Sequence, residues 1–246
     1  MNIVLNIRQR FNRVVGAAVG ALFFMTCGAV LAFFISPHQA LQARRIDRLP
    51  DMAAEDVAAT APNETILVTG RLEDNPVVAG DRFVTYVRAR WQVTTATPDK
   101  TSDSQDKEPS GKWETVDRIV PDLTLNVDGK RVEILCASGV TMSGPLHEQL
   151  VRAYSFQKAT YEGEMLAEGS ERLRGFYNGD LTTVLGKKAS TEGIIPDELF
   201  AGDRVAFAQH KKDAARGLFI GGLCMMGIAP LVLLGGVLSA LFKQRR

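Results

Sequence analysis

Carboxylates are the commonest side chains in this chain that could act as acids or bases, but their positions are typical of turns. Four of them stand beside glycine, asparagine or proline where strand patterns end: Asp74, Asp81, Asp122 and Asp128. At such positions a carboxylate accepts hydrogen bonds from neighbouring backbone amides. We therefore interpret these four as turn residues and not as a catalytic acid–base pair.

Nucleophiles and metal ligands are sparse. Ser138-Gly139 and Ser143-Gly144 lack the flanking pattern of a nucleophile elbow. Cys136 is the single cysteine outside the apolar ends of the chain, which is typical of a small buried residue and not of a reactive thiol. The three histidines lack the spacing of metal ligands: His38, His147 and His210. The sequence predicts no catalytic residue, no cofactor and no metal site.

Two apolar stretches without a charge flank the middle of the chain and are expected to anchor it. The first runs from Val14 to Ile35 and the second from Gly217 to Phe242. At about 1.5 Å per helical residue the first spans about 33 Å, enough to cross a hydrocarbon core of about 30 Å. The apolar core of a signal peptide is shorter. We therefore predict an uncleaved transmembrane helix over 14–35 and another over 217–242.

Small residues recur four positions apart within both stretches. The pairs are Gly16 with Gly20, Gly217 with Gly221, and Gly235 with Ser239. Small side chains let helix backbones approach closely in lipid. Glycine is also common in membrane helices for reasons of composition alone. These six residues are therefore candidates for helix packing, either between the two helices or against the helices of a partner.

The distribution of charge bears on orientation and partners. Basic residues crowd the two tails, 1–13 and 243–246, and the positive-inside rule then favours cytoplasmic tails and an extracytoplasmic middle. The formal net charge is +1, and removing the six basic residues of the tails leaves the middle at −5. Because affinity for phosphate backbones comes from Lys and Arg, nucleic acid is not an expected partner. The expected partners are the lipid bilayer and membrane proteins.

Alternating apolar and polar residues in the middle of the chain predict strands. They are expected at Thr65–Glu73, Phe83–Val93, Lys112–Val120, Glu171–Tyr177, Leu181–Lys187 and Arg204–Ala208. Asp128-Gly129 lies between two further alternating runs and predicts a hairpin, since both residues tolerate positive φ.

Helices and one loop complete the prediction. Ser36-Pro37 is expected to end the first helix, and residues 36–62 to form short membrane-proximal helices, with Asp51 as a helix cap. Leucines at helical spacing predict a short helix over Pro145–Lys158. Residues 96–111 are polar and predict a mobile loop.

These elements predict an α+β fold. A β-rich domain over residues 63–212, barrel-like or a curled antiparallel sheet, is flanked by the two transmembrane helices. Closure of the sheet would protect the edges of such short strands.

Several short motifs occur in a recognisable order. They are Ile46-Asp47-Arg48-Leu49, Val68-Thr69-Gly70, Tyr86-Val87-Arg88, Gly111-Lys112-Trp113, and the run from Asn178 to Gly186. In this order, between two apolar helices, they resemble the GIDE domain of the mitochondrial and plastid membrane-anchored E3 ubiquitin ligases and their prokaryotic relatives, over about residues 36–245. The resemblance implies a domain on the side of the membrane away from the cytosol. Those ligases carry a RING finger after the second helix, but this chain has no cysteine or histidine pairs for one. Ubiquitin ligase activity is therefore not expected.

Two functional hypotheses follow. The first is a non-enzymatic, membrane-anchored interaction domain that serves as a scaffold or as an accessory subunit of a larger membrane complex. The alternative is a membrane-bound enzyme, a hydrolase or a ligase-like protein, whose active site has no recognisable pattern and whose support is the abundance of acidic residues.

Overall fold

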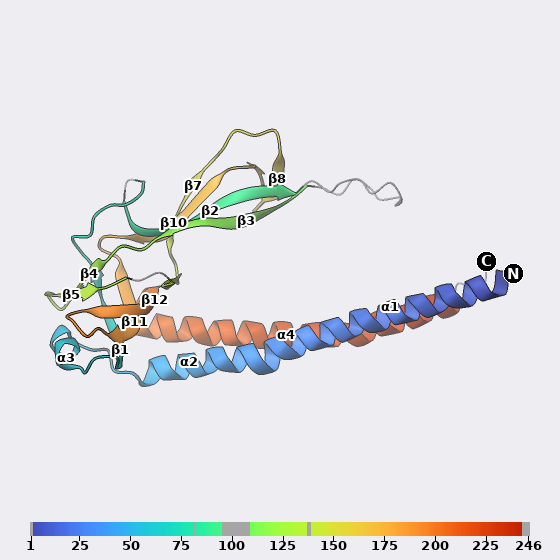
Figure 1. Ribbon diagram of the computed structural model, residues 1–246, viewed down its shortest axis with the longest axis horizontal. Coiled ribbons are helices and arrows are strands. Elements are labelled where there is room, and N and C mark those ends of the chain that lie inside the picture. Colours follow the sequence, from blue (N-terminus) through green and yellow to red (C-terminus); the bar gives the residue numbers. More distant parts are fainter. Residues whose placement is uncertain (1, 81, 95–108, 137–138, 243–246) are drawn as a thin grey trace. The chain divides into compact units, whose positions relative to one another are not determined.

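A computed structural model describes residues 2–80, 82–94, 109–136 and 139–242 of the chain (Figure 1). The helical elements are α1 (Asn2–Val30), η1 (Leu31–Ile35), α2 (Ser36–Arg48), α3 (Ala54–Ala59) and α4 (Arg204–Phe242). The strands are β1 (Thr65–Leu72), β2 (Phe83–Thr94), β3 (Ser110–Ile119), β4 (Leu123–Val127), β5 (Lys130–Ile134), β6 (Thr141–Ser143), β7 (His147–Val151), β8 (Lys158–Tyr161), β9 (Glu164–Ala167), β10 (Glu171–Tyr177), β11 (Leu181–Lys188) and β12 (Ile194–Ala201). The predicted α+β class, with a barrel-like sheet and two long apolar helices, is confirmed.

The chain divides into a helical unit, residues 1–48 with 208–246, and a strand unit, residues 49–207. In the helical unit, α1, η1 and α2 follow one another without a break, so the predicted helix end at Ser36-Pro37 is wrong. The turn before Pro37 is a π-helix in which the Ser36 amide donates to the Leu31 carbonyl, five residues back. The wider turn gives room to a proline that lacks an N–H and would crowd a carbonyl in an α-helix.

Helix α4 begins earlier than the sequence predicts. The strand expected over Arg204–Ala208 is wrong, because Asp203 caps a helix there: its Oδ1 accepts a hydrogen bond from the Ala206 amide at 2.7 Å. The spans Val14–Arg48 and Arg204–Ser239 are each long and apolar enough to cross a membrane. Within the helical unit the Ser36 hydroxyl donates to the Ala215 carbonyl at 2.9 Å, and Lys212 lies 2.7 Å from Asp47.

Five strands of the strand unit form a closed ring. β1 pairs with β11 and β4, β4 with β5, β5 with β12, and β12 with β11, while β6 pairs with β12 further along the strand than β5 does. The interior is apolar and includes Leu72, Leu125, Phe176, Val184 and Leu199, all fully buried. Burying each such side chain stabilises the fold by about 1.5–3 kcal/mol. Closure leaves few free edges on strands this short.

A second, four-stranded sheet has the order β3-β2-β10-β7, and the hairpin β8–β9 packs beside it. Three aromatic rings gather there: Trp91 lies 5.1 Å from Trp113 and 5.3 Å from Tyr161, measured between ring centres. We call these three residues the aromatic cluster. Ala159 and Leu166 of the hairpin are buried with Trp91, so the cluster holds the hairpin in place.

Several local predictions need correction. The helix expected over Pro145–Lys158 is wrong: residues 147–151 form β7, which pairs with β10 from Glu171↔Val151 to Gly175↔His147. Pairing with a neighbouring strand here overrides a weak helical pattern. Asp51 caps no helix, because its Oδ1 accepts a hydrogen bond from the Thr69 amide at 2.8 Å, on the edge of β1. In the loop expected over 96–111, residues 96–108 lie outside the described part of the chain, and Ser110 already begins β3.

Candidate functional site

Three of the four carboxylates that the sequence singles out lie in the described residues, and all three stand between strands. Asp128 (φ +51°) precedes Gly129 (φ +84°) in the β4–β5 hairpin, and Asp74 (φ +57°) follows β1. Asp122 precedes β4, and its Oδ1 accepts a hydrogen bond from the Cys136 amide at 2.8 Å. Asp81 lies outside the described residues. Asp74 and Asp128 nevertheless both line the groove described below.

The candidate nucleophiles and bases do not come together. The Ser143 hydroxyl donates to the buried Glu198 carboxylate at 2.7 Å, while Ser138 lies outside the described residues. His147 contacts Asp180 at 2.9 Å and stacks on Tyr177. Within the described ranges no three His, Cys, Asp or Glu residues are placed to hold a metal ion.

Cys136 is an unreactive thiol. Burial raises its pKa to about 12, and the nearby Asp122 carboxylate adds to the shift. Because the thiolate is the nucleophilic form, the side chain remains protonated and inert at neutral pH. The interpretation of Cys136 as a small, partly buried residue agrees with this environment.

The six helix-packing candidates have three different surroundings. Gly20 faces the other helix, since a Cβ there would lie 3.7 Å from Cγ1 of Val232. Ser239 donates to the Gly236 carbonyl of its own helix at 3.0 Å. The others have no neighbour within 4 Å of a Cβ in the described residues: Gly16, Gly217, Gly221 and Gly235.

The two long helices also approach each other closely at glycines that the spacing rule did not select. A Cβ on Gly28 would lie 2.6 Å from the Gly222 carbonyl oxygen. In turn, a Cβ on Gly222 would lie 2.6 Å from the Gly28 carbonyl oxygen and 2.9 Å from the Ala32 side chain. Contacts this short exclude any side chain at either position. Gly28 and Ala32 do form a small-xxx-small pair, so the signal was present in the sequence.

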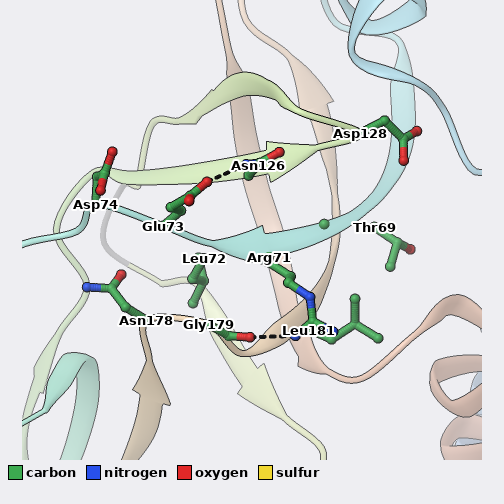
Figure 2. Close-up of a pocket in the computed structure, with 11 residues that line it drawn as sticks. Thr69, Arg71, Leu72, Glu73, Asp74, Asn126, Asp128, Asn178, Gly179 and Leu181 are labelled. Atoms are coloured by element: carbon green, nitrogen blue, oxygen red, sulfur yellow. Dashed lines mark hydrogen bonds between the residues drawn. The ribbon is translucent and has the colours of Figure 1, made fainter.

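An open groove of about 690 Å³ lies on the strand unit (Figure 2). Three segments that are far apart in the sequence line it: residues 69–74 of β1 and its extension, Asn126 and Asp128 of β4 and its turn, and Asn178, Gly179 and Leu181 around the β10–β11 turn. Gly70 is required here, because a Cβ would lie 2.5 Å from the Asn126 carbonyl oxygen and push β1 away from β4. We call this site the acidic groove.

Hydrogen bonds between its own residues hold the acidic groove in shape. The Asn126 amide donates to the Glu73 carboxylate, and the Arg71 guanidinium donates to the Gly179 carbonyl at 2.8 Å, as Figure 2 shows. Asp74 forms an ion pair with Arg131 of β5. These contacts join all three segments that line the groove.

A buried asparagine fixes the end of the groove. Asn75 is 6% exposed, its Nδ2 donates to the Thr124 carbonyl at 3.0 Å, and its Oδ1 accepts from the Thr124 amide at 2.6 Å. Asn178 reaches back to it: its Oδ1 accepts from the Asn75 amide at 3.1 Å, and its Nδ2 donates to the Asn75 carbonyl at 2.8 Å. We call this pair the asparagine clamp. Sequence reasoning missed Asn75, whose only local signal is a turn before Pro76.

The electrostatics of the acidic groove favour a cation. Three carboxylates line it, from Glu73, Asp74 and Asp128, together with the single guanidinium of Arg71. Asp74 is neutralised by Arg131, but in the described part of the chain Glu73 and Asp128 form no ion pair. The groove therefore offers two unneutralised carboxylates and several backbone groups. Such a surface can bind Lys or Arg side chains, and among its described lining residues it holds no serine, cysteine, histidine or lysine to act as a nucleophile.

Comparisons of the chain with protein-family models, with curated proteins and with solved structures find no match.

Proposed function

We propose that this protein is a non-enzymatic membrane protein that crosses the bilayer twice and uses its strand unit to bind a basic segment of a membrane-protein partner. One observation carries the binding role: an open groove, preorganised by its own hydrogen bonds, with unneutralised carboxylates and with no serine, cysteine, histidine or lysine among its described lining residues. Preorganisation lowers the entropy lost on binding. Opposite charge on the partner would direct and accelerate the encounter.

The two long apolar helices support membrane insertion. Large side chains point away from protein along both of them, such as Leu22 (67% exposed) and Phe34 (72%) on the first and Leu231 (66%) on the second. Few water-soluble proteins leave so much contiguous apolar surface uncovered. Lipid chains would cover it without cost, because they are themselves apolar.

The proposed orientation places both tails in the cytoplasm and the strand unit outside it. Its support is the cluster of basic residues at 1–13 and 243–246. A cysteine at Glu162, in the exposed turn between β8 and β9, would test this in a chain whose three natural cysteines are replaced. A membrane-impermeant maleimide should label Glu162→Cys in intact cells. Labelling only after the cells are opened would place the strand unit in the cytoplasm.

The resemblance to the GIDE domain is consistent with this proposal, since that domain also stands between two membrane helices. We extend only the anchored binding role to this chain. Ubiquitin ligase activity is not proposed, because the sequence has no cysteine or histidine pairs for a RING finger.

Charge neutralisation tests the groove. In Glu73→Gln with Asp128→Asn the side chains keep their size, and Asn tolerates the positive φ at position 128. When this double variant is purified from native membranes in mild detergent, the partner should no longer purify with it. The control, Glu133→Gln with Glu192→Gln, neutralises two exposed carboxylates outside the groove and should retain the partner. Equal recovery with both double variants would rule out binding through the groove.

Neighbouring glycines test whether the chain is an accessory subunit held by its helices. Gly221 is open on the outside of the helix pair, whereas Gly222 is pressed against Gly28. Gly221→Leu should release the partner while leaving the chain folded, and Gly222→Leu should instead separate α1 from α4. If Gly221→Leu leaves the complex intact, that face of the helix does not contact a partner.

A further inference from the structure

A second, smaller cavity of about 210 Å³ lies on one face of the four-stranded sheet, away from the acidic groove. Strand pairing sets Arg172, Ala89 and Thr115 in a row across β10, β2 and β3. Arg174 lies beside Val87 in the next row. Two apolar side chains from the segment that leads into β7, Met142 and Leu146, complete the lining. We call this cavity the basic groove.

The charge on this face is opposite to that of the whole domain. Arg118 pairs with Val87, so the face bears three guanidinium groups, from Arg118, Arg172 and Arg174. The carboxylate that faces them is Glu148 of β7, which pairs with Arg174 and lies 3.5 Å from its Nε. A local excess of positive charge therefore surrounds a small apolar cavity.

Two guanidinium Nε atoms in the basic groove are buried without a hydrogen bond in the described part of the chain, although that of Arg174 lies 3.5 Å from the Glu148 carboxylate. The Nε atoms of Arg172 and Arg174 are buried and have no hydrogen-bond partner among the described residues. The rest of the Arg172 guanidinium is held in place: its Cζ lies 4.6 Å from the centre of the Trp113 ring, and its Nη1 donates to the Tyr161 hydroxyl at 3.0 Å. A buried donor without an acceptor destabilises the protein unless a ligand satisfies it.

We propose that the basic groove binds a carboxylate at the end of a short aliphatic group. Guanidinium groups are the side chains best suited to hold a carboxylate, through charge-assisted hydrogen bonds. Val87, Ala89, Met142 and Leu146 provide the apolar contacts for the stem. The volume is below the range of about 300–1,000 Å³ that is usual for drug-sized ligands, so the stem is short. The ligand is either a free aliphatic acid or the C-terminal carboxylate of a peptide, and the experiment separates these sources.

The chain contains its own reporter for this site. Its only two tryptophans are Trp91 and Trp113, both in the aromatic cluster, and Arg172 stacks on Trp113. A carboxylate that draws the guanidinium towards itself must change the surroundings of the indole. Tryptophan fluorescence of the full-length protein in detergent then follows binding directly.

The test is a titration with hexanoate, monitored by tryptophan fluorescence and by calorimetry. Hexanoate should give a saturable change, whereas hexanol, which lacks the charge, and inorganic phosphate, which lacks the stem, should each bind at least tenfold more weakly. A pentapeptide with a free C-terminal leucine is compared with its amide. If the free peptide binds more tightly than hexanoate and the amide does not bind, the ligand is a chain terminus; if hexanoate binds more tightly than both, it is a free acid.

Variants make the proposal falsifiable even if one of them misfolds. Arg174→Gln should weaken hexanoate binding at least tenfold, and Arg90→Gln, on the opposite face of the same sheet and paired with Glu171, should leave it unchanged. Glu148→Gln removes the competing carboxylate and should tighten binding several-fold, a gain that misfolding cannot produce. Absence of saturable binding, equal binding of hexanol, or an unaltered affinity in both Arg174→Gln and Glu148→Gln would overturn the proposal. None of these results bears on the acidic groove.

Discussion

The acidic groove and the basic groove are both polar surfaces with a fixed shape, but different interactions fix them. The acidic groove stands on a closed barrel and is fixed by the asparagine clamp and by side chains that bond to one another. The basic groove stands on an open sheet and is fixed by apolar and aromatic packing, which leaves two guanidinium donors unsatisfied. The residues of the first site bond to one another before a ligand arrives, whereas in the second the Arg172 Nε has no partner among the described residues and the Arg174 Nε lies 3.5 Å from the Glu148 carboxylate. The difference predicts where each site is most easily broken.

The largest expected effect is loss of the asparagine clamp. Asn75→Ala leaves the Thr124 amide without its side-chain acceptor and removes the bonds that Nδ2 of Asn75 donates to the Thr124 carbonyl and to Oδ1 of Asn178, while the bonds between Asn178 and the backbone of residue 75 remain. We expect a loss of about 2–4 kcal/mol in the free energy of unfolding, because buried polar groups without partners are costly. Chemical denaturation of the full chain in detergent measures it. Gln157→Ala, at an exposed amide, is the control and should change the stability by less than about 0.5 kcal/mol.

A smaller loss is expected at the basic groove. Arg172→Leu removes the cation from Trp113 and the hydrogen bond to Tyr161, but leucine can still cover the ring. The expected destabilisation is about 1–2 kcal/mol. The matched change Arg90→Leu breaks an exposed ion pair with Glu171 and should cost about 0–1 kcal/mol. A larger effect at Arg90 than at Arg172 would contradict the role given to the aromatic cluster.

The thiol of Cys136 reports the integrity of the barrel. With its pKa raised to about 12, the thiol should react with iodoacetamide at pH 8 at least tenfold more slowly in the folded chain than in denaturant. The experiment uses a chain in which Cys27 and Cys224 are replaced by alanine, so that Cys136 is the only thiol. If the Asn75→Ala variant opens the barrel at that end, its alkylation should be faster. Rapid alkylation of the unaltered chain would show that the barrel is loosely closed.

The smallest effect concerns an ion pair beside the β4–β5 hairpin. Lys130 lowers the pKa of Glu55 from 4.5 by a hydrogen bond and by its charge. A carboxyl whose pKa is lowered on folding stabilises the protein above its unfolded pKa, and this contribution is lost as the pH falls through the lowered folded value. Glu55→Gln should therefore lower the melting temperature slightly at pH 7, and the difference should vanish well below pH 4.5. A difference that persists at low pH would mean that the glutamate acts through packing.

The sequence could predict the structural elements whose conformation depends on a few neighbouring residues. The Asp128-Gly129 hairpin, the alternating strand that begins at Phe83 and the two apolar helices are all of this kind, and all three are present. Strand β12 was missed, because Pro196 and the acidic residues after it interrupt the alternation. Pro196 is accommodated where the register with β11 shifts at Gly186.

The sites could be predicted only in fragments. The neighbours of Asp74 and Asp128 in the sequence indicate that both residues lie at turns. The sequence does not indicate that segments near residues 70, 126 and 179 converge on one groove. The burial of Asn75 and the pairing of Arg172 with Trp113 likewise depend on contacts between distant strands. Glycine spacing selected Gly20 correctly and overlooked Gly28 and Gly222, because the spacing alone does not tell which face of a helix meets its neighbour.

The central claim is that the strand unit binds a partner through the acidic groove, and site-specific photocrosslinking in native membranes tests it most directly. A photoreactive amino acid at Leu181, which lines the groove and is 38% exposed, is compared with one at Val116, which lies on β3 outside it and is 46% exposed. Leu181 should give one discrete adduct whose crosslinked peptide contains several Lys or Arg residues, and Val116 should not give it. The same adducts from both positions, or none from Leu181, would contradict the account.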